Sequence, residues 1–333
     1  MSRRRKILKR AFFVSVIVCV GLFVWHTDFT AVKSEIYALG HRFFYLLLVS
    51  FAAYFFGTLG WYVCLGDAAQ KISIMRLFII RQVGETIALY NPTNIIAGDM
   101  YKAQLLKTYG IDEKVGLTSV VSSRMTAVLS QVAMALIAFA WLFAYPFSFE
   151  ASAGRIEALF AISVVTVVGI VLFLLLIKYL PAPTELPETP HWWKRFGRKF
   201  HEVLYACRQF QMHQKKAFYL SFSFFAVHWV VGSLECLLIL RFLGFDVGMM
   251  EGLAMDMGII VLKSFGAFVP AQWGVEELAN KVVLVVLGIS ATSVWMTVSI
   301  IRRTRQCCWA LMGFAWLAWL RYKHHRFLTS EAV

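Results

Sequence analysis

Six stretches of this sequence are long runs of apolar residues with few interruptions. A helix needs about 20 apolar residues to cross the hydrocarbon core of a bilayer. The chain is 59% hydrophobic and 16% charged, with a mean hydropathy of +0.67, which excludes an ordinary soluble domain. The sequence therefore predicts an all-α polytopic membrane protein, a single integral membrane domain over residues 1–333, with complete crossings at Ile7–Trp25, Phe43–Leu65, Val115–Tyr145, Ala158–Lys178, Ala217–Leu243 and about Ala291–Leu320.

Basic residues, which give the chain a net charge of +14, gather in three places. They precede the first apolar run, fill the loop after residue 190, and close the chain after Leu320. By the positive-inside rule all three places are cytoplasmic, so we expect both termini on the cytoplasmic side of a bacterial inner membrane. Topology explains the charge, and no nucleic-acid partner is expected. The first run has no small-residue cleavage site and is interpreted as a retained signal-anchor helix.

Two further apolar stretches are broken by proline, glycine and a carboxylate. The first contains Pro92, Gly98 and Asp99, and the second contains Pro270, Gly274 and Glu276. Proline stops a helix and glycine permits a turn, so each stretch exposes main-chain polar groups at membrane depth. Such breaks are tolerated only inside protein or beside a water-filled cavity, and a pair of them in corresponding halves points to a transport site.

The count of crossings gives these broken stretches opposite orientations. With a cytoplasmic N-terminus, Ile74–Gly110 begins and ends inside the cell, whereas Met250–Gly288 begins and ends outside it. Each is predicted to be a re-entrant hairpin between two crossings, which makes Phe43–Tyr145 and Ala217–Leu320 the halves of an inverted repeat. The alternative is that all runs are complete spans, eight or more in number.

A linker over residues 181–216 separates the halves. Four prolines between Pro181 and Pro190 predict a stiff connection. The segment His191–Gln214 has basic and aromatic residues at helical spacing, which is typical of an amphipathic helix on the anionic leaflet. A solvated connector is the alternative interpretation.

Charged residues within the apolar regions are expensive and usually face a cavity or a partner. Four pairs on the predicted hairpins have helical spacing and are expected to share a helix face: Arg81 with Glu85, Asp99 with Lys102, Asp256 with Lys263, and Glu277 with Lys281. Mutual neutralisation within each pair is the simplest role for them.

Several arginines have no carboxylate nearby in the sequence. Arg124 lies in the third crossing, and Arg302, Arg303 and Arg305 lie in the last one. Excess guanidinium at membrane depth suits a phosphate, which it binds through two parallel hydrogen bonds. The alternatives are snorkelling of Arg124 to the interface and a cytoplasmic loop around Arg302–Arg305. Glu235 is a candidate partner for one of these arginines.

The first half contains Asn91-Pro92, Gly98-Asp99, Lys102 and the step Ser122-Ser123-Arg124, and the second contains Val269-Pro270, Gly274-Val275-Glu276 and Arg302. With these motifs the chain resembles the flippase-like membrane domain of the lysylphosphatidylglycerol synthase family. The resemblance implies two re-entrant hairpins around a polar cavity that moves a phospholipid or lipid-linked glycan between leaflets. No segment of the printed sequence is similar to the soluble domain that adds lysine, so no synthase activity is expected.

No nucleotide-binding, metalloprotease or serine-hydrolase motif is found in the sequence, so neither an enzyme nor a cofactor is predicted. The expected partner is a membrane lipid or lipid-linked anionic substrate, with self-association or an envelope-biogenesis partner left open. Five residues are predicted to bind the substrate: Arg124, Arg302, Arg303, Lys102 and Lys263. Eight are predicted to shape the hairpins or couple protons: Pro92, Gly98, Asp99, Pro270, Gly274, Glu276, Glu235 and Asp256. The alternative functions are a non-transporting subunit of a glycolipid pathway and a transferase that uses a polyprenyl-phosphate donor.

Overall fold

The computed structural model describes residues 37, 39–90, 95–144, 205, 208–210, 212, 214–264, 266, 269, 272 and 274–330. The regular elements in these residues are all helical, with no β-strand among them, which confirms the all-α prediction. They are α3 (Arg42–Cys64), the 3-10 helix η1 (Gly66–Lys71), α4 (Ile74–Tyr90), α5 (Ile95–Lys107), α6 (Glu113–Ala144), α9 (Lys215–Phe242), α10 (Met249–Ser264), α11 (Val275–Val286) and α12 (Thr292–Ser330).

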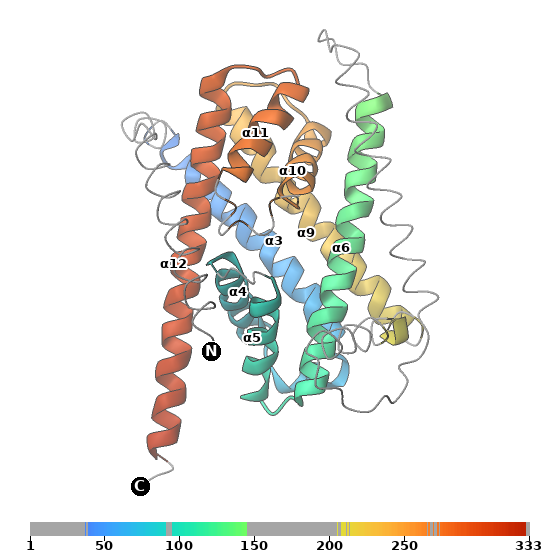
Figure 1. The fold of residues 1–333 in the computed structure, drawn as a ribbon, viewed down its shortest axis with the longest axis vertical. Helices are drawn as coiled ribbons and strands as arrows, with labels where there is room; N and C mark the ends of the chain where they lie inside the picture. Colours follow the sequence, from blue (N-terminus) through green and yellow to red (C-terminus); the bar gives the residue numbers. More distant parts are fainter. Residues whose placement is uncertain are drawn as a thin grey trace, which may run out of the picture.

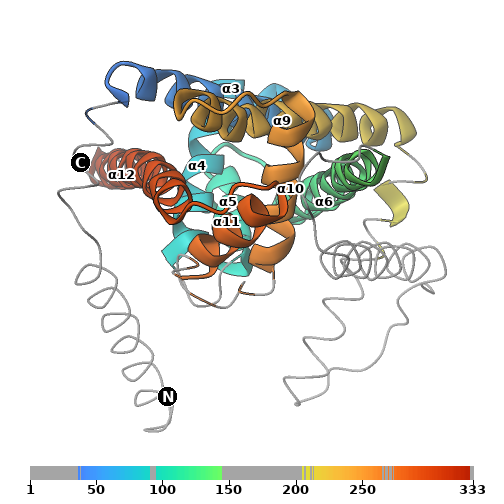
Figure 2. The ribbon, with the colours of Figure 1, turned by 90° about the horizontal axis from the view of Figure 1, so that it is seen from above.

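The helices form two groups with the same order of elements. One long helix, two short helices and a second long helix follow one another in α3 to α6 and again in α9 to α12. The pair α4–α5 lies toward one end of the molecule and the pair α10–α11 toward the other (Figure 1). Seen from above, the four short helices lie between α12 on one side and α6 on the other, with α3 and α9 side by side along one edge (Figure 2).

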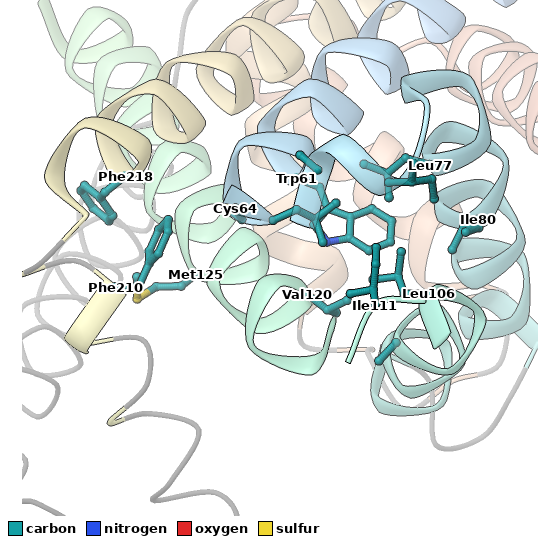
Figure 3. Packing of buried hydrophobic residues seen from close by; sticks show 14 residues of the cluster. Trp61, Cys64, Leu77, Ile80, Leu106, Ile111, Val120, Met125, Phe210 and Phe218 are labelled. Carbon is teal, nitrogen blue, oxygen red and sulfur yellow. The ribbon is translucent and has the colours of Figure 1, made fainter. Parts of the chain in front are cut away.

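Each pair of short helices packs into its own hydrophobic core. Around α4–α5, the indole of Trp61 on α3 packs against Leu77, Leu106 and Val120 (Figure 3). Around α10–α11, Leu46 of α3 packs with residues of α9 to α12. Opposite ends of α3 therefore pack into the two cores, so this one helix contacts both helix groups.

The long helices agree closely with three of the predicted crossings. Within the described residues, three helices are long and apolar enough to cross a membrane: Arg42–Cys64, Glu113–Leu142 and Lys215–Phe242. The α12 helix covers the last predicted crossing without interruption, so the alternative of a loop around Arg302–Arg305 is wrong. The predicted crossings Ile7–Trp25 and Ala158–Lys178, and most of the 181–216 linker, lie outside the described residues.

The two predicted breaks fall between helices, but their glycines differ in role. Gly274 has φ of 76° and is the N-cap of α11, as expected for a residue that permits a turn. Gly98 lies inside α5, where an added Cβ would stand 2.4 Å from the carbonyl oxygen of Gly84 on α4. The predicted turn at Gly98 is therefore wrong, because this glycine instead lets α4 and α5 approach closely. Pro92 and Pro270 lie outside the described residues.

Candidate functional site

A polar cavity of about 400 Å³ lies between the two helix groups. Its walls come from both groups, since Arg124 of α6 and Arg302 of α12 both line it. Other charged residues in the wall are Arg81, Glu85, Asp99, Lys102, Lys263 and Arg305. A membrane-spanning chain that keeps so many ionisable groups around an interior space is typical of a substrate or ion pathway.

Four charged residues of α4, α5 and α6 form what we call the first ion-pair network: Glu85, Asp99, Lys102 and Arg124. The Lys102 ammonium lies 2.6 Å from Glu85 and 2.9 Å from Asp99. Arg124 donates to both oxygens of Asp99, from Nη2 at 2.9 Å and from Nε at 3.2 Å, and its Nη2 lies 3.5 Å from Glu85. Both cations thus share both carboxylates, and the network joins the helix pair to the long helix α6.

The second ion-pair network is centred on Glu276, at the start of α11. Its carboxylate is 1% exposed and accepts from Lys263 Nζ at 2.9 Å and from Arg302 Nε at 3.3 Å. Gln306 Nε2 donates to both oxygens, at 2.9 and 2.8 Å. Arg302 also lies 3.4 Å from Asp256 on α10. Glu276 therefore ties α10, α11 and α12 together, and its position in the first turn of α11 also suits the helix dipole.

Two more arginines of α12 have carboxylate partners. Arg303 donates to Glu277 through Nε at 2.7 Å and through Nη2 at 3.2 Å, in the fork geometry favoured for this pair. Arg305 donates to Glu235 of α9 at 2.5 Å and to the hydroxyl of Tyr54 at 2.8 Å. The prediction that Glu235 pairs with one of these arginines is confirmed.

These contacts correct the predicted charge pairing. Four arginines have no carboxylate nearby in the sequence, and Glu235 was the one partner suggested for them: Arg124, Arg302, Arg303 and Arg305. All four have carboxylate partners, because side chains distant in sequence meet across helices. Of the four pairs expected from helical spacing, Asp99 with Lys102 forms an ion pair. In the other three the side chains have different partners: Glu85 binds Lys102, Asp256 and Lys263 both bind residues of the second network, and Lys281 lies over the ring of Trp295.

The two networks occupy equivalent places in their helix groups. In each, a carboxylate near the start of the second short helix binds an arginine of the following long helix. Asp99 and Arg124 are 25 residues apart, and Glu276 and Arg302 are 26 apart. The same carboxylate–arginine contact therefore occurs at the equivalent place in both helix groups.

Solvent exposure distinguishes the networks. The side chains of Glu85 and Arg124 are 37% and 35% exposed, whereas those of Glu276 and Arg302 are 1% and 5% exposed. The difference lies in these four side chains, because Lys102 and Asp99 of the first network are 6% and 14% exposed and Lys263 of the second is 18% exposed.

Aromatic residues complete the cavity wall and were not predicted as part of the site. They are Tyr54, Trp61, Phe225, His228, Trp229 and Trp309. His228 is buried and its Nδ1 lies 2.6 Å from the carbonyl oxygen of Ala53, so that contact joins α9 to α3. Arg81 and Gln306 were also missed. The four-residue spacing between Arg302 and Gln306 is a signal that sequence reasoning can use, whereas nothing local marks Tyr54 or His228.

The predicted site residues divide into two sets. Arg124, Arg302, Lys102, Lys263 and Asp99 line the cavity. The others among the described residues, Arg303, Glu276, Glu235, Asp256, Gly98 and Gly274, are not part of its lining. Three of these residues bind arginines of α12: Glu276 and Asp256 bind Arg302, and Glu235 binds Arg305.

The chain is similar to one known protein family over most of its length. No curated protein and no solved structure shows a significant match. The family model described as "Lysylphosphatidylglycerol synthase TM region" matches residues 7–313, which include every residue that lines the cavity and both helix groups as far as Gly313 in α12. The chain therefore belongs to the lysylphosphatidylglycerol synthase TM family, a family of membrane proteins of lipid metabolism or transport.

Proposed function

We propose that this protein moves an anionic phospholipid or lipid-linked glycan precursor between the leaflets of the bacterial inner membrane. The observation that carries the proposal is a single interior cavity lined by cations of both helix groups, Arg124 from one and Arg302 from the other. A headgroup phosphate that enters this cavity exchanges its hydration shell for charge-assisted hydrogen bonds. Its acyl chains remain in the hydrocarbon.

The lengths of the short helices support two re-entrant hairpins. With 13 residues in α5 and 12 in α11, these helices measure only about 18–20 Å, against a hydrocarbon core of about 30 Å. A helix of that length that enters a membrane has to turn back inside it. Each pair would therefore enter and leave on one face, with its break beside the cavity, where polar main chain is tolerated.

The inverted repeat supplies a transport cycle. Helix pairs of the same build that enter from opposite faces offer the cavity two gates, one toward each leaflet. The greater exposure of Glu85 and Arg124 than of Glu276 and Arg302 fits one of two access states, open on the α4–α5 side. Headgroup binding would shift the population between these states if it contacts the two networks differently.

In this proposal Arg124 and Arg302 contact the headgroup, with Lys102 and Lys263 beside them in the cavity wall. Asp99 and Glu276 hold the ends of α5 and α11 and are candidates for proton coupling. Arg303 is not in the lining, so we assign it to the support of Glu277 and not to the substrate. The chain acts without chemical conversion of the lipid, with both termini in the cytoplasm.

A bleaching assay tests the proposal. The purified full chain is reconstituted into vesicles that contain fluorescent phosphatidylglycerol, and dithionite reduces the probe in the outer leaflet. A transporter exposes the inner-leaflet probe, so we expect the bleached fraction to rise from about half toward completion, while protein-free vesicles stop at the outer-leaflet fraction. A trace equal to that of protein-free vesicles would instead favour the non-transporting subunit, and a new product from a lipid-linked donor would favour the transferase.

A further inference from the structure

The charges around the cavity do not balance. Seven cationic side chains of the described residues line the cavity or bind its networks: Arg81, Lys102, Arg124, Lys263, Arg302, Arg303 and Arg305. They face six carboxylates: Glu85, Asp99, Glu235, Asp256, Glu276 and Glu277. One positive charge remains, and the ion pairs show where it resides.

Among these seven cations, Arg81 of α4 is the one that has no ion pair within the described residues. Its neighbour by helical spacing, Glu85, is engaged by Lys102 and Arg124, and within the described residues no carboxylate lies within ion-pair distance of Arg81. The other six cations each have such a partner. An interior guanidinium that shares its nearest carboxylate with two other cations and has no ion pair of its own is costly, so its presence at a cavity calls for a ligand.

Within the described part of the chain, Arg81 has one hydrogen bond, so most of its donors have no acceptor there. A guanidinium has five N–H donors. Nη1 donates to the carbonyl oxygen of Tyr54 at 3.3 Å, and the Tyr54 ring lies 5.8 Å from Cζ. At Gly57 an added Cβ would stand 2.8 Å from Nη2, so the absence of a side chain there gives the guanidinium its space.

The next residue of α4, Gln82, also has a donor without an acceptor among the described residues. Gln82 lines the cavity, is 5% exposed, and has a buried amide nitrogen without a hydrogen-bond partner in the described part of the chain. Two adjacent residues thus bring unsatisfied donors to the same wall. Unsatisfied buried donors are rare in native proteins, and a bound acceptor is one of the usual reasons for them.

We propose that Arg81, with Gln82 beside it, is the anion anchor of the cavity and takes one negatively charged oxyanion group, the phosphodiester of a lipid headgroup. A phosphodiester carries a single charge, which balances the single unpaired cation, and its two free oxygens match the guanidinium fork. The assignment of a lipid as the source of this group rests on the proposed function. The arginines of α12 keep their carboxylates, so binding at Arg81 requires no ion pair to break.

A binding titration tests the anchor. Short-chain phosphatidylglycerol is added to the detergent-solubilised full chain, and tryptophan fluorescence reports occupancy because Trp61, Trp229 and Trp309 line the cavity. We expect Arg81→Met to weaken binding by about 10- to 100-fold, the usual worth of a charged hydrogen bond. The matched control is Arg76→Met, an exposed arginine of the same helix that lies over Tyr109, with unchanged binding.

Two further readouts separate the outcomes. Arg81→Met leaves no carboxylate unpaired, so its thermal midpoint should equal or exceed that of the natural chain, whereas Arg305→Met strands Glu235 and should lower it. Equal affinity of Arg81→Met and the natural chain for the short-chain lipid would overturn the anchor. Inorganic phosphate that binds as tightly as the lipid would overturn the lipid source. If the natural chain binds the lipid through Arg81 but does not translocate it, the transport proposal is contradicted, while the assignment of Arg81 as the anion anchor is still supported.

Discussion

Replacement of Glu276 by alanine is expected to destabilise the protein by about 3–5 kcal/mol, the usual cost when one partner of a buried ion pair is removed. Lys263, Arg302 and Arg303 all lie within 3.5 Å of this carboxylate, and Gln306 donates to both of its oxygens. Without it, Lys263 loses its ion pair, while Arg302 retains Asp256 and Arg303 retains Glu277. The change is measured by SDS titration of detergent-solubilised protein, with helix content followed by circular dichroism.

The control for this experiment is Glu113→Ala. Glu113 begins α6 and pairs with Lys107, but both side chains are at least half exposed. Exposed pairs contribute about 0–1 kcal/mol, so this variant should unfold close to the natural chain. If Glu276→Ala is as stable as Glu113→Ala, the second network does not hold α10, α11 and α12 together.

Replacement of Arg124 by glutamine is expected to slow lipid translocation by about 10- to 100-fold, which corresponds to the loss of one charged hydrogen bond at 1.5–3 kcal/mol. Arg124 is the partly exposed cation of the accessible network, so it is placed to meet an entering headgroup. The fold should survive, because Lys102 continues to pair with both Glu85 and Asp99. The rate is measured by dithionite bleaching in reconstituted vesicles.

Lys114→Gln is the matched control, because it removes one positive charge from an exposed position of the same helix. It should translocate lipid at the natural rate. Helix content and SDS unfolding of Arg124→Gln are checked alongside, so that a folding defect is not mistaken for a transport defect. A well-folded Arg124→Gln with the natural rate would remove Arg124 from the substrate path.

The sequence predicted the helix positions well because apolar runs are a local signal. Phe43–Leu65 was expected and Arg42–Cys64 is found, and Ala217–Leu243 agrees with Lys215–Phe242 to within two residues. The boundary near Gly288 was likewise visible as a break between apolar runs, and α11 ends at Val286. Burial of apolar side chains in lipid or protein requires such runs whatever the helix arrangement.

The partners of the charged side chains were not predictable by the same means. Spacing along one helix suggested Arg81 with Glu85 and Asp256 with Lys263, but Lys102 reaches Glu85 from another helix and Arg302 reaches Asp256 across 46 residues. Helical spacing shows which side chains share a face and does not show which helix that face meets. The arginines without nearby carboxylates were therefore placed in the third and last crossings, now α6 and α12, whereas among the described cavity residues it is Arg81 of α4 that has no ion pair.

The central claim is that the helix pairs α4–α5 and α10–α11 enter the membrane from opposite faces and meet at the cavity. It is tested by single cysteines at exposed positions that flank each pair, in a chain whose natural cysteines are replaced. Asp67 and Thr108 flank α4–α5, and Asp246 and Ser290 flank α10–α11. A membrane-impermeant thiol reagent is applied to intact spheroplasts and, separately, to inverted vesicles.

Opposed hairpins predict that Asp67→Cys and Thr108→Cys react in inverted vesicles, and that Asp246→Cys and Ser290→Cys react in spheroplasts. Each pair of short helices would then begin and end on one face, as a half-crossing requires. If all four cysteines react from one face, the two pairs enter the membrane from the same side, and if the two ends of one pair react from different faces, that pair crosses the membrane an odd number of times. Either result contradicts the account of two opposed gates around one cavity.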